Sequence, residues 1–326
     1  MRYLLGRGLG LALGLGAVGA PAALAQERTT VGGYGEVHYT NRSGPASPAT
    51  VNLARFVVYL AHSFDARLAF RSELEVEDAK VEGGSTGGEV SLEQAYLDYR
   101  LADGLTLRTG LVLVPVGIIN ETHEPPSFNG VARPGFDHDV IPTTWREIGI
   151  GAVGAIPGGG GLAYRVYLVN GLRAEGFTAA EGLRDGRQEG RNASFANPSF
   201  TGRLEWARPG WKIGGSFWYG GTADTATAVG TGTFAAAVTL LSADARADLG
   251  ALALRAVVAN VSVSDAQAID AAYGQAVGSR IAGGYLEVAY DVLRALVPAS
   301  SQKLQAFLRH ERYDTQADVP AGVTRD

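Results

Sequence analysis

The sequence predicts an all-β fold whose antiparallel strands form a barrel that crosses a membrane. Apolar and polar residues alternate along many segments of about ten residues, which is the side-chain period of a β-strand. Short and long connections between these segments also alternate, as they do in bacterial outer-membrane barrels. The 45 glycines disfavour an all-helical fold, because glycine weakens helix interiors.

The first 25 residues have the pattern of a secretory signal peptide. Arg2 and Arg7 precede an apolar stretch over residues 8–19, and Ala23-Leu24-Ala25 supplies an A-x-A cleavage site. We therefore expect residues 1–25 to be a signal peptide and residues 26–326 to form one outer-membrane barrel domain. An N-terminal membrane anchor is the alternative, but a spanning helix needs about 20 apolar residues.

Residues 67–78 show the alternation plainly. Apolar Leu74 and Val76 stand between the charged residues Glu73, Glu75 and Glu77. Such a strand has one apolar face and one charged face. We expect the apolar face to contact outer-membrane lipid and the charged face to line a water-filled lumen, because a sheet in lipid must close to pair every backbone group.

The same pattern predicts thirteen strands. We expect them over residues 31–40, 51–64, 66–79, 89–101, 104–114, 145–157, 161–171, 198–208, 210–221, 237–248, 249–263, 281–293 and 302–314. The long connections are residues 41–50, 80–88, 115–144, 172–197, 222–236 and 264–280, and tight turns lie between them. Tight turns on one rim and long loops on the other indicate an outer-membrane barrel, since a soluble sandwich has no such strict alternation.

Two motifs around the third long connection resemble those of the phosphate-selective porin O and P family. In that family one strand ends in a G-Q-F-K-V-P-F-G-like motif, and a later strand begins with an R-D-I-G-like motif. The matching residues here are Gly110, Val114, Pro115 and Gly117 for the first motif, and Arg146, Ile148 and Gly149, with Glu147 for aspartate, for the second. Further matches are the strand of Arg55 and the segments 95–100, 166–171 and 308–313.

The resemblance implies a 16-stranded porin in the bacterial cell outer membrane. Such a protein forms a water-filled channel for passive diffusion of small hydrophilic or anionic solutes, with phosphate as one candidate and a homotrimer as the candidate assembly. The sequence departs from the family at Leu113, where the motif has a basic residue. This departure separates the general porin expectation from the phosphate expectation.

The polar faces of the predicted strands supply the candidate channel-lining residues. The basic set is Arg55, Arg71, Arg100, Arg108, Arg165, Arg203, Lys212, Arg246, Arg255 and Arg309, and the acidic set is Glu73, Glu75, Glu77, Asp98, Glu205, Asp244, Asp248, Glu287, Asp291 and Glu311. Rings of one sign give a pore its ion preference, so this balance implies weak selectivity unless one sign clusters. The guanidinium groups suit capture of carboxylate or phosphate. The alternative is that they pair with acids on adjacent strands.

The loop over residues 115–144 is the third on the long-loop side. By resemblance to general porins, we expect it to fold into the barrel and narrow it. The candidate constriction residues are Asn120, Glu121, His123, Glu124, Asn129, Arg133, Asp137, His138 and Asp139. Imidazole and carboxylate groups suit zinc, but their spacing matches no metal site, so we expect a hydrogen-bonded polar loop without metal or cofactor.

Other classes of function fit less well. A net charge of -5 offers no basic footprint for nucleic acid, and a chain without cysteine has no thiolate metal site or catalytic thiol. A barrel hydrolase would need a catalytic histidine, but no G-x-S-x-G motif occurs, and Ser63 points away from the adjacent His62. We therefore expect no enzyme. A ligand-binding receptor or adhesin barrel remains the alternative.

The thirteenth strand raises a question of number. Single-chain bacterial barrels have an even number of strands. We therefore expect the sequence to lack about three strands of a 16-stranded barrel at its C-terminus. The alternative is a miscounted strand in a natural barrel of about 12 or 14 strands.

Overall fold

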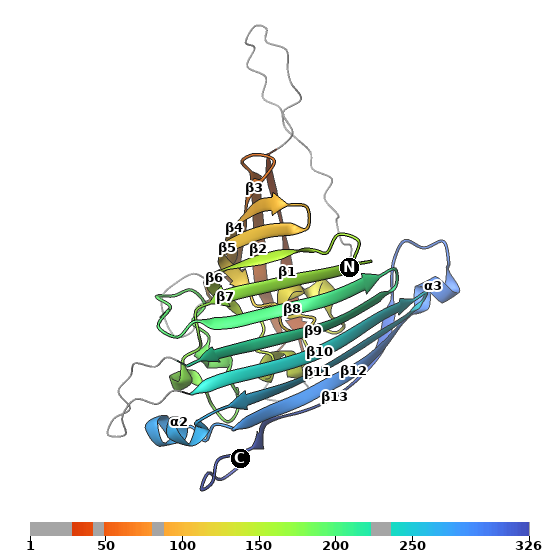
Figure 1. Cartoon of the computed structure of the whole chain (residues 1–326). Helices are drawn as coiled ribbons and strands as arrows, with labels where there is room; N and C mark the ends of the chain where they lie inside the picture. Colours follow the sequence, from red (N-terminus) through yellow and green to blue (C-terminus); the bar gives the residue numbers. More distant parts are fainter. Residues whose placement is uncertain (1–27, 42–48, 80–87, 223–235, 326) are drawn as a thin grey trace.

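Within the described residues, one antiparallel sheet of thirteen strands contains most of the chain (Figure 1). The computed structural model describes residues 28–41, 49–79, 88–222 and 236–325, so the expected signal peptide lies outside the described residues. The strands are β1 (Thr29–Thr40), β2 (Thr50–Ser63), β3 (Leu68–Glu77), β4 (Val90–Ala102), β5 (Leu105–Leu113), β6 (Arg146–Ala155), β7 (Leu162–Val169), β8 (Ser199–Arg208), β9 (Trp211–Gly221), β10 (Ala237–Leu249), β11 (Leu252–Val263), β12 (Arg280–Asp291) and β13 (Gln305–Asp318). The predicted all-β antiparallel fold class is confirmed.

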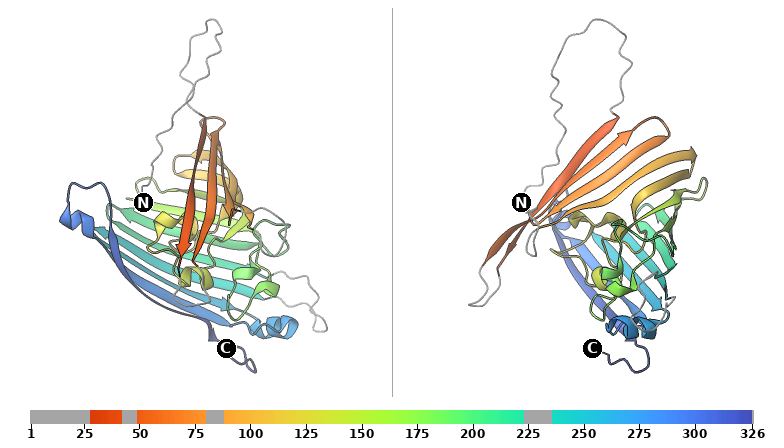
Figure 2. Two further views of the ribbon diagram at one scale, coloured as in Figure 1. Left: turned by 180° about the vertical axis from the view of Figure 1, so that it is seen from behind. Right: turned by 90° about the vertical axis from the view of Figure 1, so that its left-hand side faces the viewer.

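Each strand pairs with its neighbours in chain order, and the sheet curls strongly around the loops that it encloses (Figure 2). The two edge strands are β1 and β13, which do not pair with each other within the described ranges. The register shifts at four places, between Glu36 and Val37, Glu73 and Leu74, Arg100 and Ala102, and Arg280 and Ala282. Each shift lets a strand bend and changes which side chain faces inward.

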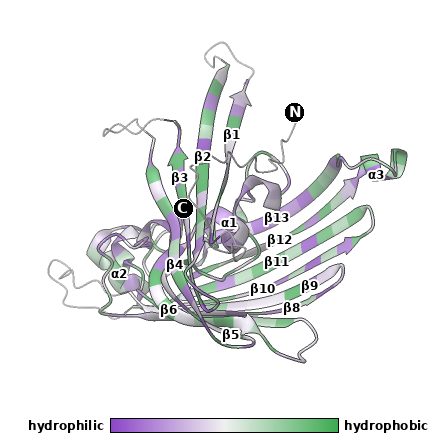
Figure 3. Cartoon of the chain, turned by 90° about the horizontal axis from the view of Figure 1, so that it is seen from above, coloured by the Kyte–Doolittle hydropathy of each residue, from purple (hydrophilic) through white to green (hydrophobic). Residues whose placement is uncertain are grey.

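The sheet has apolar side chains on its outward face and charged side chains on its inward face, which is the reverse of a soluble protein. On β8, Leu204 and Trp206 are exposed, whereas the neighbouring residues Arg203 and Glu205 are buried. Hydrophobic and hydrophilic residues alternate in the same way along other strands (Figure 3). Because large apolar side chains point outward and charges point inward, the outward face suits lipid and the inward face suits water.

The inner face is apolar in one region, which the sequence analysis did not predict. Trp218, Leu240, Val261 and Ile281 lie on the inner face of β9 to β12 near the long loops, and they are fully buried in one hydrophobic cluster. Loop residues such as Phe177 belong to the same cluster. The barrel interior therefore contains a packed core at the long-loop end of these strands.

Short helices lie in the connections. They are η1 (Asn120–Thr122), η2 (Pro125–Ser127), α1 (Phe136–Asp139), η3 (Ala174–Gly176), η4 (Arg184–Gly186), α2 (Ala266–Tyr273) and α3 (Val292–Leu296). Helix α3 replaces the simple turn expected after β12, because the Asp291 carboxylate accepts a hydrogen bond from the backbone N–H of Arg294 and caps the helix. Among the described residues, no helix has the length and apolar character to span a membrane.

Candidate functional site

The loop over residues 115–144 lies across the inner face of the sheet (Figure 2). Its polar residues reach strands that are far apart in the sequence. The contacts are Tyr59 Oη to Glu124 Oε1 at 2.9 Å, Arg165 Nε to Glu121 Oε1 at 2.9 Å, Asn129 Nδ2 to Glu287 Oε1 at 2.9 Å and Phe136 N to Glu311 Oε2 at 3.2 Å. These contacts hold the loop against β2, β7, β12 and β13.

Asn120 joins the two ends of this loop. Its Nδ2 donates to the carbonyls of Val114 at 2.7 Å and Trp145 at 2.9 Å, and its Oδ1 accepts from the Trp145 N–H at 2.6 Å. The side chain is fully buried, so these bonds satisfy all the polar groups involved. Asn120 therefore shapes the base of the loop and does not face solvent.

A second loop, over residues 172–197, supports the first. Arg184 Nη1 donates to the Thr143 carbonyl at 2.5 Å, and Arg187 Nη1 donates to the Thr144 carbonyl at 2.9 Å. Arg133 from the first loop donates to Thr143 Oγ1 at 2.9 Å. The sequence analysis missed this role, because arginines in a polar loop are expected in solvent and carry no signal of a carbonyl partner.

His123 is buried at the foot of the first loop. Its Nδ1 lies 3.3 Å from the Asn120 carbonyl, and its Nε2 lies 3.7 Å from Glu73 Oε1 on β3. Burial, helped by the positive charge of Arg133, lowers the pKa of His123 to about 3, so the imidazole is neutral near pH 7. His123 is thus an uncharged part of the loop base.

Asp137 on α1 is also fully buried. Burial raises the pKa of Asp137 to about 7, against the opposing influence of the Tyr285 hydroxyl and the Arg133 guanidinium. The folded-state pKa lies above the ordinary value of 3.8, so folding favours the protonated form of Asp137. The stability that this group contributes is fully present below pH 3.8 and is lost as pH rises through about 7. The stability of the loop over residues 115–144 therefore depends on the protonation state of Asp137.

We expect the loop over residues 115–144 to open more readily at pH 8 than at pH 5, and the variant Asp137→Asn to remove most of that difference. The readout is limited proteolysis of the folded protein in detergent at both pH values. Asp139→Asn, which alters a half-buried carboxylate two residues away, is the control and should keep the pH dependence. Equal cleavage of the unmodified protein at both pH values would contradict the expectation.

The remaining acidic and histidine residues of α1 meet a carboxylate of the second loop. His138 Nδ1 lies 2.5 Å from Asp139 Oδ1 and 3.4 Å from Glu181 Oε2. The possible ligand atoms of these three residues lie within 4.8 Å of one another. Sequence spacing did not reveal this cluster, because Glu181 lies far along the chain from His138.

Ion pairs engage most of the predicted basic lining residues. Their acidic partners are Glu36 and Glu75 for Arg55, Asp98 for Arg71 and Arg108, Glu121 for Arg165, Glu205 and Asp244 for Arg203, Glu205 for Arg246, and Glu287 for Arg255 and Arg309. Arg100 donates to the Ala66 carbonyl instead. The alternative of cross-strand pairing thus describes much of the wall.

Arg203 is the centre of the most buried of these networks. It forms a two-pronged pair with Asp244, with Nη1 to Oδ2 at 2.6 Å and Nη2 to Oδ1 at 2.9 Å, and Nη2 also lies 3.0 Å from Glu205 Oε2. A Cβ at position 214 would lie 2.0 Å from Arg203 Nη2, so Gly214 makes room for the guanidinium. The same inner face carries Ser216, which accepts a bond from Arg203 Nη1 at 3.0 Å.

Three cationic residues lie side by side on neighbouring strands, close to the strand ends that short connections join. Lys212 on β9 pairs in register with Arg246 on β10, and Arg246 pairs with Arg255 on β11. A pocket of about 210 Å³ is lined by these three residues together with Arg208 and Asp248. Within the described residues, Lys212 has no ion pair or hydrogen bond, and its side chain is exposed. The row formed by Lys212, Arg246 and Arg255 thus places three positive charges side by side on the inner wall.

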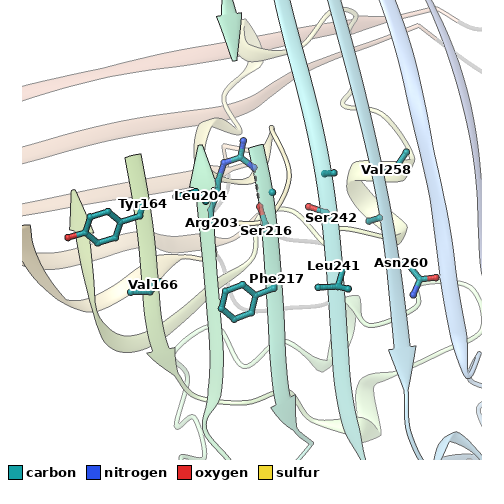
Figure 4. Close-up of a pocket in the computed structure, with 13 residues that line it drawn as sticks. Tyr164, Val166, Arg203, Leu204, Ser216, Phe217, Leu241, Ser242, Val258 and Asn260 are labelled. Carbon is teal, nitrogen blue, oxygen red and sulfur yellow. Dashed lines mark hydrogen bonds between the residues drawn. The ribbon is translucent and has the colours of Figure 1, made fainter. Parts of the chain in front are cut away.

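A second hollow, of about 640 Å³, is apolar (Figure 4). Leu204, Leu241 and Val258 line it from the outward face, and Gly215 leaves it open because glycine has no side chain. The hydrogen bond between Arg203 and Ser216 lies at its inner side. The hollow is therefore part of the apolar outward face and does not offer a polar solute site.

Comparison with known proteins shows the porin fold. No protein-family model matches the chain. An uncharacterized protein of Aquifex aeolicus (strain VF5) is 37% identical in an alignment of 324 residues that covers 96% of this chain and 72% of that protein. The anion-selective porin from Comamonas acidovorans has a TM-score of 0.54 at 11% identity, covering 87% of this chain and 79% of that chain. OmpF of Salmonella typhi, solved with daunomycin, has a TM-score of 0.51 at 13% identity, covering 87% and 77%.

Proposed function

We propose that this chain, which belongs to the same family as the uncharacterized Aquifex aeolicus protein, is an outer-membrane porin through which small hydrophilic and anionic solutes diffuse passively. The porin fold and the apolar outward face support a place in the bacterial outer membrane. The proposal assigns no catalytic step to the chain. Its constriction is the loop over residues 115–144, which crosses the inner face.

The anion preference that we propose depends on the row formed by Lys212, Arg246 and Arg255. Like charges directly opposite one another on neighbouring strands destabilise a sheet. A passing anion offsets that repulsion, and positive groups lining a pore favour anions over cations. Guanidinium groups also match the oxygens of carboxylate and phosphate, so phosphate is one candidate solute.

We expect the folded protein to conduct in planar bilayers and to prefer chloride over potassium. The measurement is the reversal potential across a KCl gradient. Lys212→Gln should move that potential toward zero, and Lys212→Glu should move it further, because each removes positive charge from the row. Lys212 is exposed and without a partner among the described residues, so neither change should impair folding.

The matched control is Arg71→Gln, which removes an inner-face cation outside the row and should shift the potential less. Absence of conductance from correctly folded protein would overturn the porin proposal and favour a receptor or adhesin barrel. Conductance without anion preference would leave a general diffusion pore and remove the anion part. Chemical cross-linking in detergent tests the homotrimer that we propose as the assembly, since a single band of monomer would exclude it.

A further inference from the structure

Glu73 and His123 form a buried pair on the inner face. No arginine or lysine among the described residues balances the Glu73 carboxylate. Glu73 on β3 is 0% exposed, and His123 in the loop over residues 115–144 is 1% exposed. Glu73 Oε1 and His123 Nε2 face each other at 3.7 Å, which is too long for a hydrogen bond. Neither atom has a hydrogen-bond partner among the described residues, although buried polar atoms almost always have one.

The tautomer of His123 makes this contact unfavourable as it stands. The Asn120 carbonyl can only accept a hydrogen bond, so His123 Nδ1, at 3.3 Å from it, carries the proton. The Nε2 atom of a neutral imidazole then presents its lone pair to the Glu73 carboxylate. Two acceptors therefore face each other in a buried place, and no arginine or lysine of the described residues forms an ion pair with Glu73. A buried carboxylate without a counter-charge is costly.

We propose that a divalent transition-metal ion of the zinc class binds between His123 Nε2 and Glu73 Oε1. Zinc binds imidazole nitrogen and carboxylate oxygen at about 2.0–2.2 Å, so a bent arrangement of the two ligands spans the 3.7 Å separation. These two atoms are the protein ligands that we assign to the ion, and water completes its coordination.

The surroundings of the pair have the hydrogen bonds that support metal ligands. A metal-bound histidine donates its other ring N–H to a carbonyl or carboxylate, and a metal-bound carboxylate is itself hydrogen-bonded. The Asn120 carbonyl supplies the first bond, and Gln94 Nε2 supplies the second by donating to Glu73 Oε2 at 2.7 Å. Each residue thus leaves free only the atom that faces the other.

The ion joins the constriction loop to the wall. His123 belongs to the loop and Glu73 belongs to β3, so a shared metal holds the foot of the loop against the strand. The half-buried cluster of His138, Asp139 and Glu181 is a weaker candidate, because His138 already has a hydrogen-bonded carboxylate at 2.5 Å and solvent reaches all three residues.

Metal binding is tested with Zn²⁺ and Co²⁺ on the refolded full chain in detergent, after treatment with a chelator. We expect one Zn²⁺ per chain by calorimetry and a visible absorption band with Co²⁺. Glu73→Gln and His123→Gln should each weaken binding by at least about tenfold, which is the scale that even an outer-shell partner sets. Gln94→Leu should weaken it by about 10–100-fold without touching a ligand atom.

Two control variants separate the outcomes. His38→Gln removes a histidine whose Nε2 already has a hydrogen bond of 2.8 Å to Glu36, so it should leave Zn²⁺ binding unchanged. His138→Ala should also leave it unchanged. Loss of binding in His138→Ala with retention in His123→Gln would place the ion in the cluster of His138, Asp139 and Glu181, and would overturn the proposal. Absence of Zn²⁺ and Co²⁺ binding by the folded unmodified chain would overturn it as well, and would favour a proton held between the two residues.

Discussion

The variant Arg203→Ala is expected to lower the free energy of unfolding by about 3–5 kcal/mol. The Arg203 and Asp244 side chains are 1% and 0% exposed, and they form a two-pronged ion pair that Glu205 extends. Removal of the guanidinium leaves the Asp244 carboxylate buried without its counter-charge. That uncompensated charge is much costlier than the loss of a solvated ion pair. Equilibrium unfolding by urea in lipid vesicles measures the change.

Arg71→Ala is the control for this experiment. Arg71 also belongs to the inner face and also has an acidic partner, Asp98, but the separation is 3.9 Å and the Arg71 side chain is 58% exposed. Exposed pairs of this kind contribute about 0–1 kcal/mol. Equal effects of the two variants would show that water reaches Arg203, and would contradict the buried network.

The variant Leu241→Arg is expected to destabilise the protein in a lipid bilayer by about 2–4 kcal/mol. Leu241 points outward from the middle part of β10 and is 59% exposed. In a soluble protein an exposed leucine can become arginine at little cost. In a barrel the same position faces hydrocarbon, where a charged side chain loses its hydration.

A second arginine on the same strand tests whether the cost depends on depth. Leu249→Arg lies at the end of β10 beside a short connection, and we expect a cost of about 0–1 kcal/mol there. Unfolding in vesicles measures both variants, and Leu241→Met controls for the change of side-chain shape. The outward face would not be in lipid if both arginine variants were as stable as the unmodified protein.

Strand number and the direction of each face could be predicted from the sequence, because both follow from local alternation. Leu204 and Trp206 are apolar and outward, and Arg203 and Glu205 are charged and inward, as a period of two requires. All thirteen strands occur in the predicted places, with boundaries that differ by a few residues. Alternation is decided within a strand, so distant residues do not alter it.

Strict alternation fails where a bulge interrupts the strand. Strict alternation would put the adjacent residues Glu93 and Gln94 on opposite faces of β4. The register shift between Glu73 and Leu74 allows both to point inward, where Gln94 binds Glu73 and Glu93 pairs with Arg146 at 2.9 Å. A bulge depends on the partner strand, and the pattern of one strand does not contain it.

The sequence by itself determined the strands, the apolar outward face and the supply of charges for the inner face. Only the tertiary structure decided which charges meet. The register places Lys212 beside Arg246 and Arg255, and the folded loop brings His123 to Glu73. Side-chain alternation is a local property of the backbone. The contacts between these charged residues depend instead on strand register and on how a long loop packs across the sheet, and both are set by residues far apart in the chain.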